Sequence, residues 1–139
     1  MINGRCMCGD VTVEVAKLTE HMNACHCEMC RRWAGSAFVA VHGVAADVTF
    51  SGPVKTIASS KWATRGWCDN CGSSLFYRIN EDGSYGLAVG LFDNAAGKTL
   101  NIEYYVDQKP DGFAYLGDHK RMTEAETLAY FGISEGEMP

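Results

Sequence analysis

The 139-residue chain has few prolines, no excess of basic charge and no long apolar segment. Its 3 prolines and the absence of repeats or low-complexity tracts leave no sign of a linker. No apolar run approaches the roughly 18 residues of a membrane-spanning helix. Lys and Arg number 12 against 17 Asp and Glu, a formal net charge of −5, whereas nucleic-acid surfaces are usually basic. We therefore expect neither a membrane nor a nucleic acid as a partner.

The size of the chain suits a single domain over residues 1–139, because this length can bury a real core. The segment Met1–Arg5 lacks the charged and then apolar pattern of a secretory signal. We therefore expect a cytoplasmic protein. The oligomeric state is not indicated by the sequence.

Cysteine, in contrast, is abundant, with 7 residues. Disulfides are uncommon in the reducing cytoplasm, where closely spaced cysteines more often bind metal or take part in catalysis. An odd number cannot pair completely, and Cys-x-Cys neighbours suit disulfide geometry poorly. The pattern therefore predicts metal binding.

The densest cysteine segment reads Cys25-His26-Cys27-Glu28-Met29-Cys30. Three thiols at spacings of two and three residues can turn toward one point, and thiolates select zinc over magnesium or calcium. Three sulfurs leave a tetrahedral zinc one ligand short, which is typical of a catalytic site.

The other four cysteines form two close pairs. Cys6 and Cys8 precede a predicted strand, and in an extended backbone residues two apart point to the same side. Cys68 and Cys71 lie on a tight turn that can hold one metal ion. The two pairs together would make a closed, structural site. Spacing alone leaves another partition open, in which Cys27 and Cys30 join Cys68 and Cys71 as in a zinc ribbon.

Short apolar segments at close intervals predict a mainly β, antiparallel fold. One or two helical turns are expected over residues 28–34, and a capping box at Thr123–Glu126 predicts a short C-terminal helix. The strands are expected over residues 11–15, 21–25, 38–44, 47–50, 54–59, 75–79, 85–91 and 100–106.

Three cysteine motifs occur in a specific order along the chain: Gly4-x-Cys6-x-Cys8-Gly9, Cys25-His26-Cys27-x-x-Cys30-Arg31 and Cys68-x-x-Cys71-Gly72-Ser73. In this combination the chain resembles the glutathione-dependent formaldehyde-activating enzyme family, also called the GFA or CENP-V/GFA domain. The resemblance extends over most of the chain.

The resemblance implies an Mss4-like antiparallel β fold with two zinc sites. One is a structural site formed by Cys6, Cys8, Cys68 and Cys71, and the other is a catalytic site formed by Cys25, Cys27 and Cys30. The namesake of the family joins glutathione and formaldehyde to S-(hydroxymethyl)glutathione, a carbon–sulfur lyase reaction. The partners implied are therefore a small thiol such as glutathione and a small aldehyde.

Residues next to the catalytic triad are candidates for substrate binding. Arg31 and Arg32 can pair with the carboxylates of glutathione, although a solvated helix face is the commoner role of such a pair. Trp33 is expected to border the pocket. His26 is expected to orient the site by a hydrogen bond, because adjacent residues seldom both reach one metal. The remaining histidines have no partner motif and are expected on strands or at the surface: His21, His42 and His119.

Two other functions remain open at this point. The Mss4-like fold also serves non-catalytic zinc-binding modules. A redox enzyme resembling methionine sulfoxide reductase B is the other alternative, and it would need a cysteine free of metal, which only the segment Cys25–Cys30 can supply.

Overall fold

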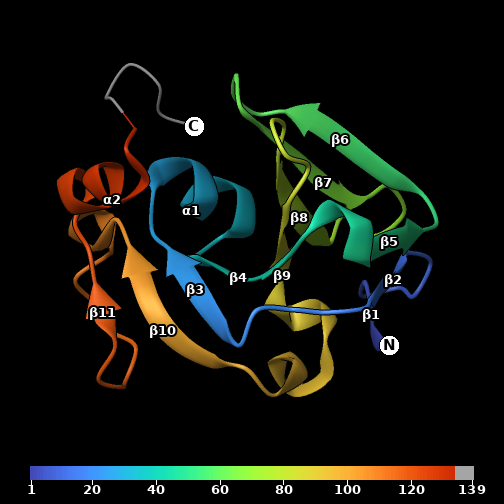
Figure 1. Cartoon of the computed structure of the whole chain (residues 1–139), viewed down its shortest axis with the longest axis horizontal. Coiled ribbons are helices and arrows are strands. Elements are labelled where there is room, and N and C mark those ends of the chain that lie inside the picture. Colours follow the sequence, from blue (N-terminus) through green and yellow to red (C-terminus); the bar gives the residue numbers. More distant parts are fainter. Residues whose placement is uncertain (134–139) are drawn as a thin grey trace.

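The computed structural model describes residues 1–133, in which the strands form two sheets (Figure 1). The smaller sheet has the order β1-β2-β5, and the larger has the order β11-β10-β3-β4-β9-β8-β7-β6. The mainly β, antiparallel-rich fold predicted from the sequence is confirmed. The strands are β1 (Ile2–Arg5), β2 (Thr12–Val15), β3 (His21–Cys25), β4 (Phe38–Gly43), β5 (Val48–Ser51), β6 (Val54–Ala58), β7 (Ala63–Cys68), β8 (Ser74–Ile79), β9 (Tyr85–Ala88), β10 (Thr99–Tyr104) and β11 (Lys120–Arg121).

Parallel pairing occurs at one edge of the larger sheet. There β10 lies parallel to both β3 and β11, whereas the other described strand pairs are antiparallel. The register sets Tyr104 opposite Cys25. This pairing brings the C-terminal third of the chain beside the first residue of the dense cysteine segment.

The main core lies between the two sheets, and its residues follow the period-two pattern of the sequence. Val13 and Val15 on β2 are 1% and 0% exposed, while the alternate residues Thr12 and Glu14 face solvent. They pack in one cluster with Val41 and other buried residues of the larger sheet. Burial of each such side chain contributes about 1.5–3 kcal/mol, so this cluster holds the two sheets together.

Cys6 and Cys8 lie on a turn and not on an extended backbone. Ile2–Arg5 forms β1, which the sequence did not predict, and residues 6–10 make the turn that joins it to β2. The Cys6 N–H donates to the Val11 carbonyl at 3.0 Å, and the Gly9 N–H to the Cys6 carbonyl at 3.2 Å. Gly9 has φ 84°, a conformation that glycine adopts without a steric penalty.

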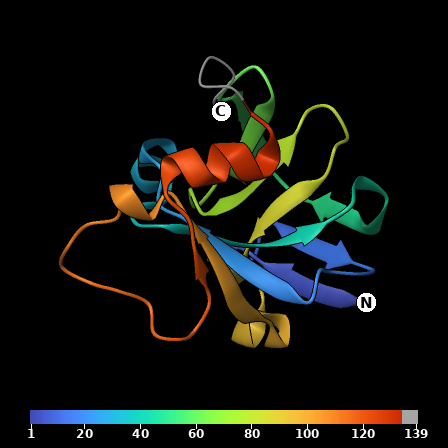
Figure 2. The same ribbon diagram turned by 60° about the vertical axis from the view of Figure 1, so that its left-hand side comes forward.

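Two α-helices lie beside each other at the carboxyl ends of β3 and β10 (Figures 1 and 2). They are α1 (Glu28–Ala34), as expected, and α2 (Glu124–Phe131), which begins at the predicted capping box of Thr123 and Glu126. Within the described residues neither helix has the length and apolar character needed to cross a bilayer. Short 3₁₀ turns complete the structure: η1 (Ala45–Asp47), η2 (Val89–Leu91), η3 (Asp93–Gly97) and η4 (Val106–Gln108).

Residues 134–139, the end of the domain expected from the sequence, lie outside the described residues.

Candidate metal centres

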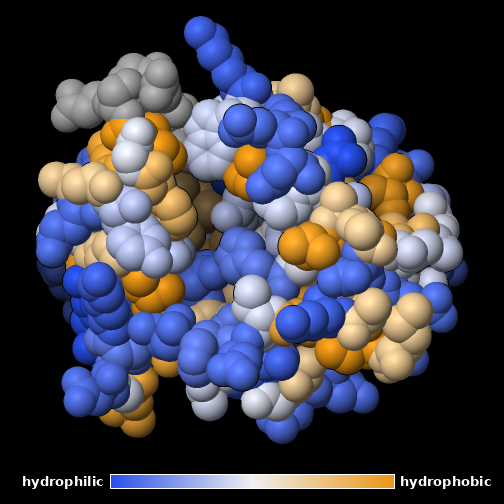
Figure 3. Space-filling view, viewed as in Figure 1, coloured by the Kyte–Doolittle hydropathy of each residue, from blue (hydrophilic) through white to orange (hydrophobic). Residues whose placement is uncertain are grey.

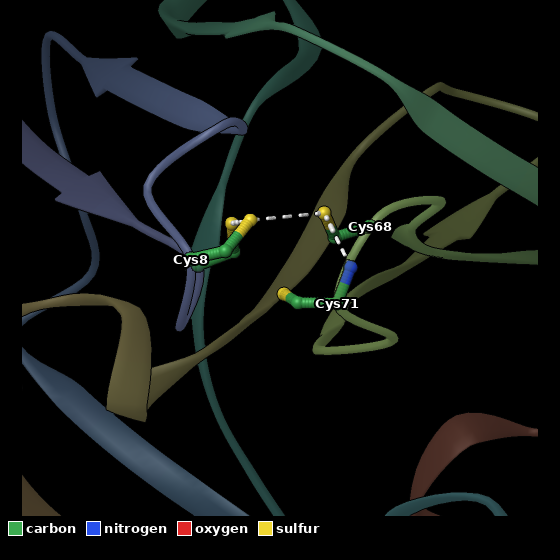
Figure 4. Close-up of side chains that lie close together, drawn as sticks. Cys8, Cys68 and Cys71 are labelled. Carbon is green, nitrogen blue, oxygen red and sulfur yellow. Dashed lines mark hydrogen bonds between the residues drawn. The ribbon is translucent and has the colours of Figure 1, made fainter.

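The first cysteine cluster joins the β1–β2 turn to the β7–β8 turn. The Cys6 and Cys8 sulfurs are 3.6 Å apart, and the Cys8 and Cys68 sulfurs 3.9 Å. Figure 4 shows the Cys8, Cys68 and Cys71 side chains pointing toward one another. All four sulfurs lie within 4.8 Å of one another. We call this the four-cysteine cluster.

The spacing of these sulfurs fits a tetrahedral zinc ion. A zinc–sulfur bond of about 2.3 Å places the sulfurs of a tetrahedron about 3.8 Å apart, close to the two measured separations. Backbone N–H groups also reach the sulfurs: Val11 N donates to Cys6 Sγ at 3.3 Å and Cys71 N to Cys68 Sγ at 3.4 Å. Hydrogen bonds from Ser73 lower the pKa of Cys71 to about 5. The backbone N–H of Cys71 lowers the pKa of Cys68, but burial and the neighbouring thiols outweigh it and raise this pKa to about 11. The spacing of the four sulfurs therefore suits a metal ion with four protein ligands and no open position.

The second cluster lies where β3 ends and α1 begins. The sulfurs of Cys25, Cys27 and Cys30 lie within 4.8 Å of one another. Cys27 is the N-cap of α1, and its sulfur accepts the Cys30 N–H at 3.4 Å. We call this the three-cysteine cluster. The structure thus does not pair Cys27 and Cys30 with the β7–β8 turn, and the zinc-ribbon partition is absent.

The three-cysteine cluster holds its protons unequally. Hydrogen bonds from the Cys25 and Cys30 thiols lower the pKa of Cys27 to about 3. The same interaction with Cys27 raises the pKa of Cys25 well above its usual range. A hydrogen bond with Cys25 lowers the pKa of Cys30, but the bond to Cys27 and burial outweigh it and raise this pKa to about 11. The three thiols titrate as one coupled group.

Arg65 on β7 is a site residue that the sequence analysis missed. Its side chain is 5% exposed, and its Nη2 donates to Cys30 Sγ at 3.5 Å. The guanidinium carbon lies 4.9 Å from the centre of the Trp33 ring and 5.9 Å from that of Tyr77. A buried cation beside a thiolate cluster favours the negative charge on the sulfurs. No local motif marks Arg65, because its position depends on the packing of β7 against α1.

Two cavities adjoin the three-cysteine cluster. The first, which we call the aromatic pocket, has a volume of about 80 Å³ and is bordered by all three sulfur-bearing residues and Arg65. Figure 3 shows a hollow between the part of the molecule that carries α2, where its wall is hydrophobic, and the β6–β7 turn. Its other walls are mainly aromatic and aliphatic, from Phe38, Trp62, Tyr77, Tyr104, Leu128 and Phe131.

The second cavity is a wider, polar recess of about 680 Å³, which we call the open groove. Cys27, Arg65 and Tyr105 border both cavities, so the two meet at the cluster. Trp33, expected from the sequence at a pocket, lines the open groove together with Arg32.

The two arginines after the triad have different positions. Arg31 donates from Nε to the His26 carbonyl at 3.2 Å and so braces the turn that carries the cysteines. Arg32 has a side chain 72% exposed and pairs with Glu28 one helical turn earlier, at 2.9 Å. Contact of either arginine with a substrate stays a prediction.

Comparison with known proteins agrees with this geometry. The family model of the glutathione-dependent formaldehyde-activating enzymes (GFA) matches residues 1–108. The chain belongs to this family. It is also 28% identical over 127 residues to a Schizosaccharomyces pombe protein named as an uncharacterized lyase. This match covers 90% of this chain and 93% of that protein.

A crystal structure of a Rhodobacter sphaeroides protein has the same fold. It superposes with a TM-score of 0.57 and 20% sequence identity, over 86% of this chain and 99% of that chain. At this identity the likeness shows the fold alone.

Behind the three-cysteine cluster of this GFA-family chain lies a buried polar network around Glu103 on β10. His26 is 0% exposed, and its Nε2 lies 2.7 Å from one carboxylate oxygen of Glu103. His119 Nε2 bonds the other oxygen, and Arg121 Nε lies 3.2 Å from it. Burial raises the pKa of Glu103, but hydrogen bonds from His119 and His26 outweigh it and lower this pKa below 4.5. His26 thus anchors the cysteine turn to β10, in line with the orienting role expected of it.

The surface or strand position expected for His119 is wrong. Its side chain is only 4% exposed, because the segment before β11 folds back over Glu103. The other two histidines lie on strands as expected, His21 on β3 and His42 on β4, where burial lowers the pKa of His42. His119 and the whole of α2 lie beyond the GFA match at residues 1–108.

Tyr105 holds a strained backbone at the junction of the two cavities. Its φ of 59° and ψ of 42° are left-handed, a conformation that costs an aromatic residue of order 1–3 kcal/mol. The residue is 5% exposed, and its N–H donates to Thr127 Oγ1 on α2 at 3.4 Å. Strain of this kind is maintained only where the surrounding structure fixes it, and here it turns the chain around the cysteine cluster.

Proposed function

We propose that this chain is a zinc-dependent carbon–sulfur lyase that adds a thiol, glutathione or a similar compound, to a small aldehyde. The observation that carries the proposal is the position of the three-cysteine cluster. It offers three sulfurs to a metal ion, one fewer than tetrahedral zinc binds, and all three residues border the aromatic pocket. Membership of the GFA family and the lyase-named relative support a lyase.

The donor set fits zinc at both clusters. Cys6, Cys8, Cys68 and Cys71 would hold the structural ion, and Cys25, Cys27 and Cys30 the catalytic one. When bound at the three-cysteine cluster, zinc supplies a fourth position for an incoming thiol and lowers the pKa of that thiol. Arg65 offsets part of the negative charge that three protein thiolates bring to the site.

The open groove suits the thiol substrate. Glutathione has two carboxylates and one ammonium group, and the groove presents both signs of charge: Arg32 and Arg65 against Glu28 and Glu124. Arginine binds carboxylates through paired donors, so Arg32 is our candidate for one carboxylate, with Arg31 as a neighbour that holds the turn. Trp33 supplies a flat apolar wall for the peptide chain.

The aromatic pocket suits the aldehyde. Its walls are mainly apolar, and a bound aldehyde that displaces water from it would strengthen the electrostatic effect of Arg65 on the reacting atoms. The sulfur of the substrate thiol would form a bond to the carbonyl carbon, the carbonyl π pair would move onto oxygen, and this oxygen would take up a proton equivalent to the one that the thiol lost. All seven cysteines are free. Because the reducing cytoplasm keeps thiols free, the proposal includes a cytoplasmic location.

The test measures metal content and thiol–aldehyde exchange together. Native mass spectrometry should show two zinc ions, and NMR exchange spectroscopy with glutathione and formaldehyde should show faster interconversion with S-(hydroxymethyl)glutathione than in buffer. Cys27→Ser should lose one zinc ion and the acceleration. Two firmly held zinc ions with no acceleration for any thiol would favour the non-catalytic module. One zinc ion, a reactive Cys27 and reduction of methionine sulfoxide would favour the redox enzyme.

A further inference from the structure

Arg65 has hydrogen-bonding capacity that the protein itself does not use. Its Nε and Nη1 are buried and have no hydrogen-bond partner within the described chain. No carboxylate of residues 1–133 lies within ion-pairing distance of it. Buried polar groups in proteins nearly always have partners, so two unpartnered donors on a residue that lines both cavities point to a bound ligand.

The guanidinium is held in place by its neighbours. The ring contacts with Trp33 and Tyr77 and the bond from Nη2 to Cys30 Sγ restrain it from three directions. Arginine stacks on aromatic rings in this way while its in-plane N–H groups stay available. The unused donors are therefore fixed beside the sulfurs, as a site that stabilises developing charge requires.

Two of the other polar side chains around the aromatic pocket already have partners. Asn23 Nδ2 lies 2.6 Å from His42 Nε2, and Thr127 Oγ1 donates to the Thr123 carbonyl at 2.8 Å. Arg65 is the one charged side chain among the described residues that border this pocket. The ligand atom that meets it must be a hydrogen-bond acceptor attached to a mainly apolar body.

The volume of the pocket limits the size of that body. An engineered apolar cavity of about 150 Å³ accommodates benzene. The aromatic pocket, at about 80 Å³, is roughly half as large. It therefore suits an aliphatic chain of about two to four carbon atoms better than an aromatic ring.

We propose that Arg65 binds the carbonyl oxygen of a short aliphatic aldehyde seated in the aromatic pocket and stabilises the negative charge that forms on this oxygen. The proposal rests on the lyase function above and names its aldehyde-binding residue and substrate class. Addition of the thiolate sulfur forms the carbon–sulfur bond and moves the carbonyl π pair to oxygen. The oxygen, held by Arg65 Nε or Nη1, then takes up a proton from water, and the product is the hemithioacetal.

The first experiment reads the carbonyl contact without turnover. Butanone carries the same carbonyl on a four-carbon body and adds thiols poorly. With butanone labelled at the carbonyl carbon, NMR of the zinc-loaded protein should show a bound signal shifted downfield, because a charged donor polarises the carbonyl. Arg65→Met should abolish this shift and weaken binding at least tenfold. Absence of the shift in the wild-type protein, or its persistence in Arg65→Met, would overturn the assignment.

The control variant is Arg78→Met on the neighbouring strand β8. Arg78 also has a buried Nε without a partner and lies over an aromatic ring, that of Tyr85 at 6.0 Å, but it borders neither cavity. Arg78→Met should leave the butanone signal unchanged. A loss of the signal in Arg78→Met as large as that in Arg65→Met would overturn the proposal. If Arg65→Met does not fold, Arg65→Lys replaces it as the test variant, because lysine keeps the positive charge beside the thiols. Arg65→Lys should reduce the downfield shift of the butanone signal.

Turnover separates this proposal from the lyase function itself. With propanal as substrate, Arg65→Met should lower kcat about 10²–10³-fold, the loss typical of a removed oxyanion donor, with two zinc ions retained. Propanal should be used more efficiently than benzaldehyde, and equal use of both would refute the size limit. A wild-type protein that shifts butanone but turns over no aldehyde would refute the lyase function and leave the carbonyl site intact. Full turnover by Arg65→Met would refute the carbonyl site and leave the lyase function intact.

Discussion

Replacement of one cysteine in each cluster should separate the structural site from the functional one. Cys68 is 0% exposed and links turns 60 residues apart through its contact with Cys8. Structural zinc contributes about 10–16 kcal/mol in zinc-finger peptides, so one of four sulfurs accounts for about 2.5–4 kcal/mol. The free energy of unfolding of a domain is only about 5–15 kcal/mol. Cys68→Ser should therefore remove a large part of the stability and lower Tm by roughly 10 °C.

Cys27→Ser is the matched variant in the three-cysteine cluster. That cluster lies within the six residues from Cys25 to Cys30, so its metal closes no long loop. Cys27 is also the N-cap of α1, a position where serine is among the preferred residues. We expect this variant to lose one zinc ion while its free energy of unfolding changes by less than about 1 kcal/mol.

Urea unfolding followed by tryptophan fluorescence measures both variants, with native mass spectrometry for the metal content. The proteins should be compared at equal zinc concentration, because free metal stabilises whichever state binds it. A loss of stability that is equal in the two variants would refute the division into structural and functional clusters. So would a Cys68→Ser protein as stable as the wild type.

Two further predictions concern the support behind the site. Glu103→Gln should cost about 3 kcal/mol of stability, because it breaks a buried charged network. The pKa of Glu103 is lowered from its ordinary value, so the stabilisation is fully present above that ordinary value and is lost as the pH falls through the lowered pKa. Urea midpoints from pH 7 to 3 should fall less steeply in Glu103→Gln than in the wild type, and parallel curves would contradict this. Gly66→Ala should lower the stability by about 1–3 kcal/mol in thermal unfolding, because its Cβ would lie 2.4 Å from the Phe76 ring. Gly90→Ala is the control, since Gly90 has open space around it, and it should have little effect.

The motif chemistry was readable from the sequence because it is local. Cys25, Cys27 and Cys30 reach one point through a single chain turn, and Cys68 and Cys71 through another, so spacing alone indicates metal ligands. The alternation in Thr12–Val15 and the capping box of α2 are equally local, and both predictions agree with the structure. Which pair completes the four-cysteine cluster was not fixed by spacing, since Cys6 and Cys8 meet it from a turn more than 50 residues away.

The surroundings of the three-cysteine cluster were decided only by the tertiary structure. Arg65 reaches Cys30 from 35 residues away, and Glu103 reaches His26 from 77 residues away. Neither residue carries a motif, because each acquires its role through strand pairing and the packing of α1 against the larger sheet. The same holds for His119, which a single sequence places at the surface and the fold buries against Glu103.

The sequence by itself therefore indicated the candidate metal ligands and the mainly β fold, and its cysteine motifs resembled those of the GFA family, because these patterns depend on neighbouring residues. The tertiary structure decided how the cysteines group, which cation lies beside them and what shape of cavity a substrate meets. The physical reason is that thiol spacing acts over a few bonds, whereas burial of Arg65 and the walls of the aromatic pocket require β7, β10 and α2 to pack around one point.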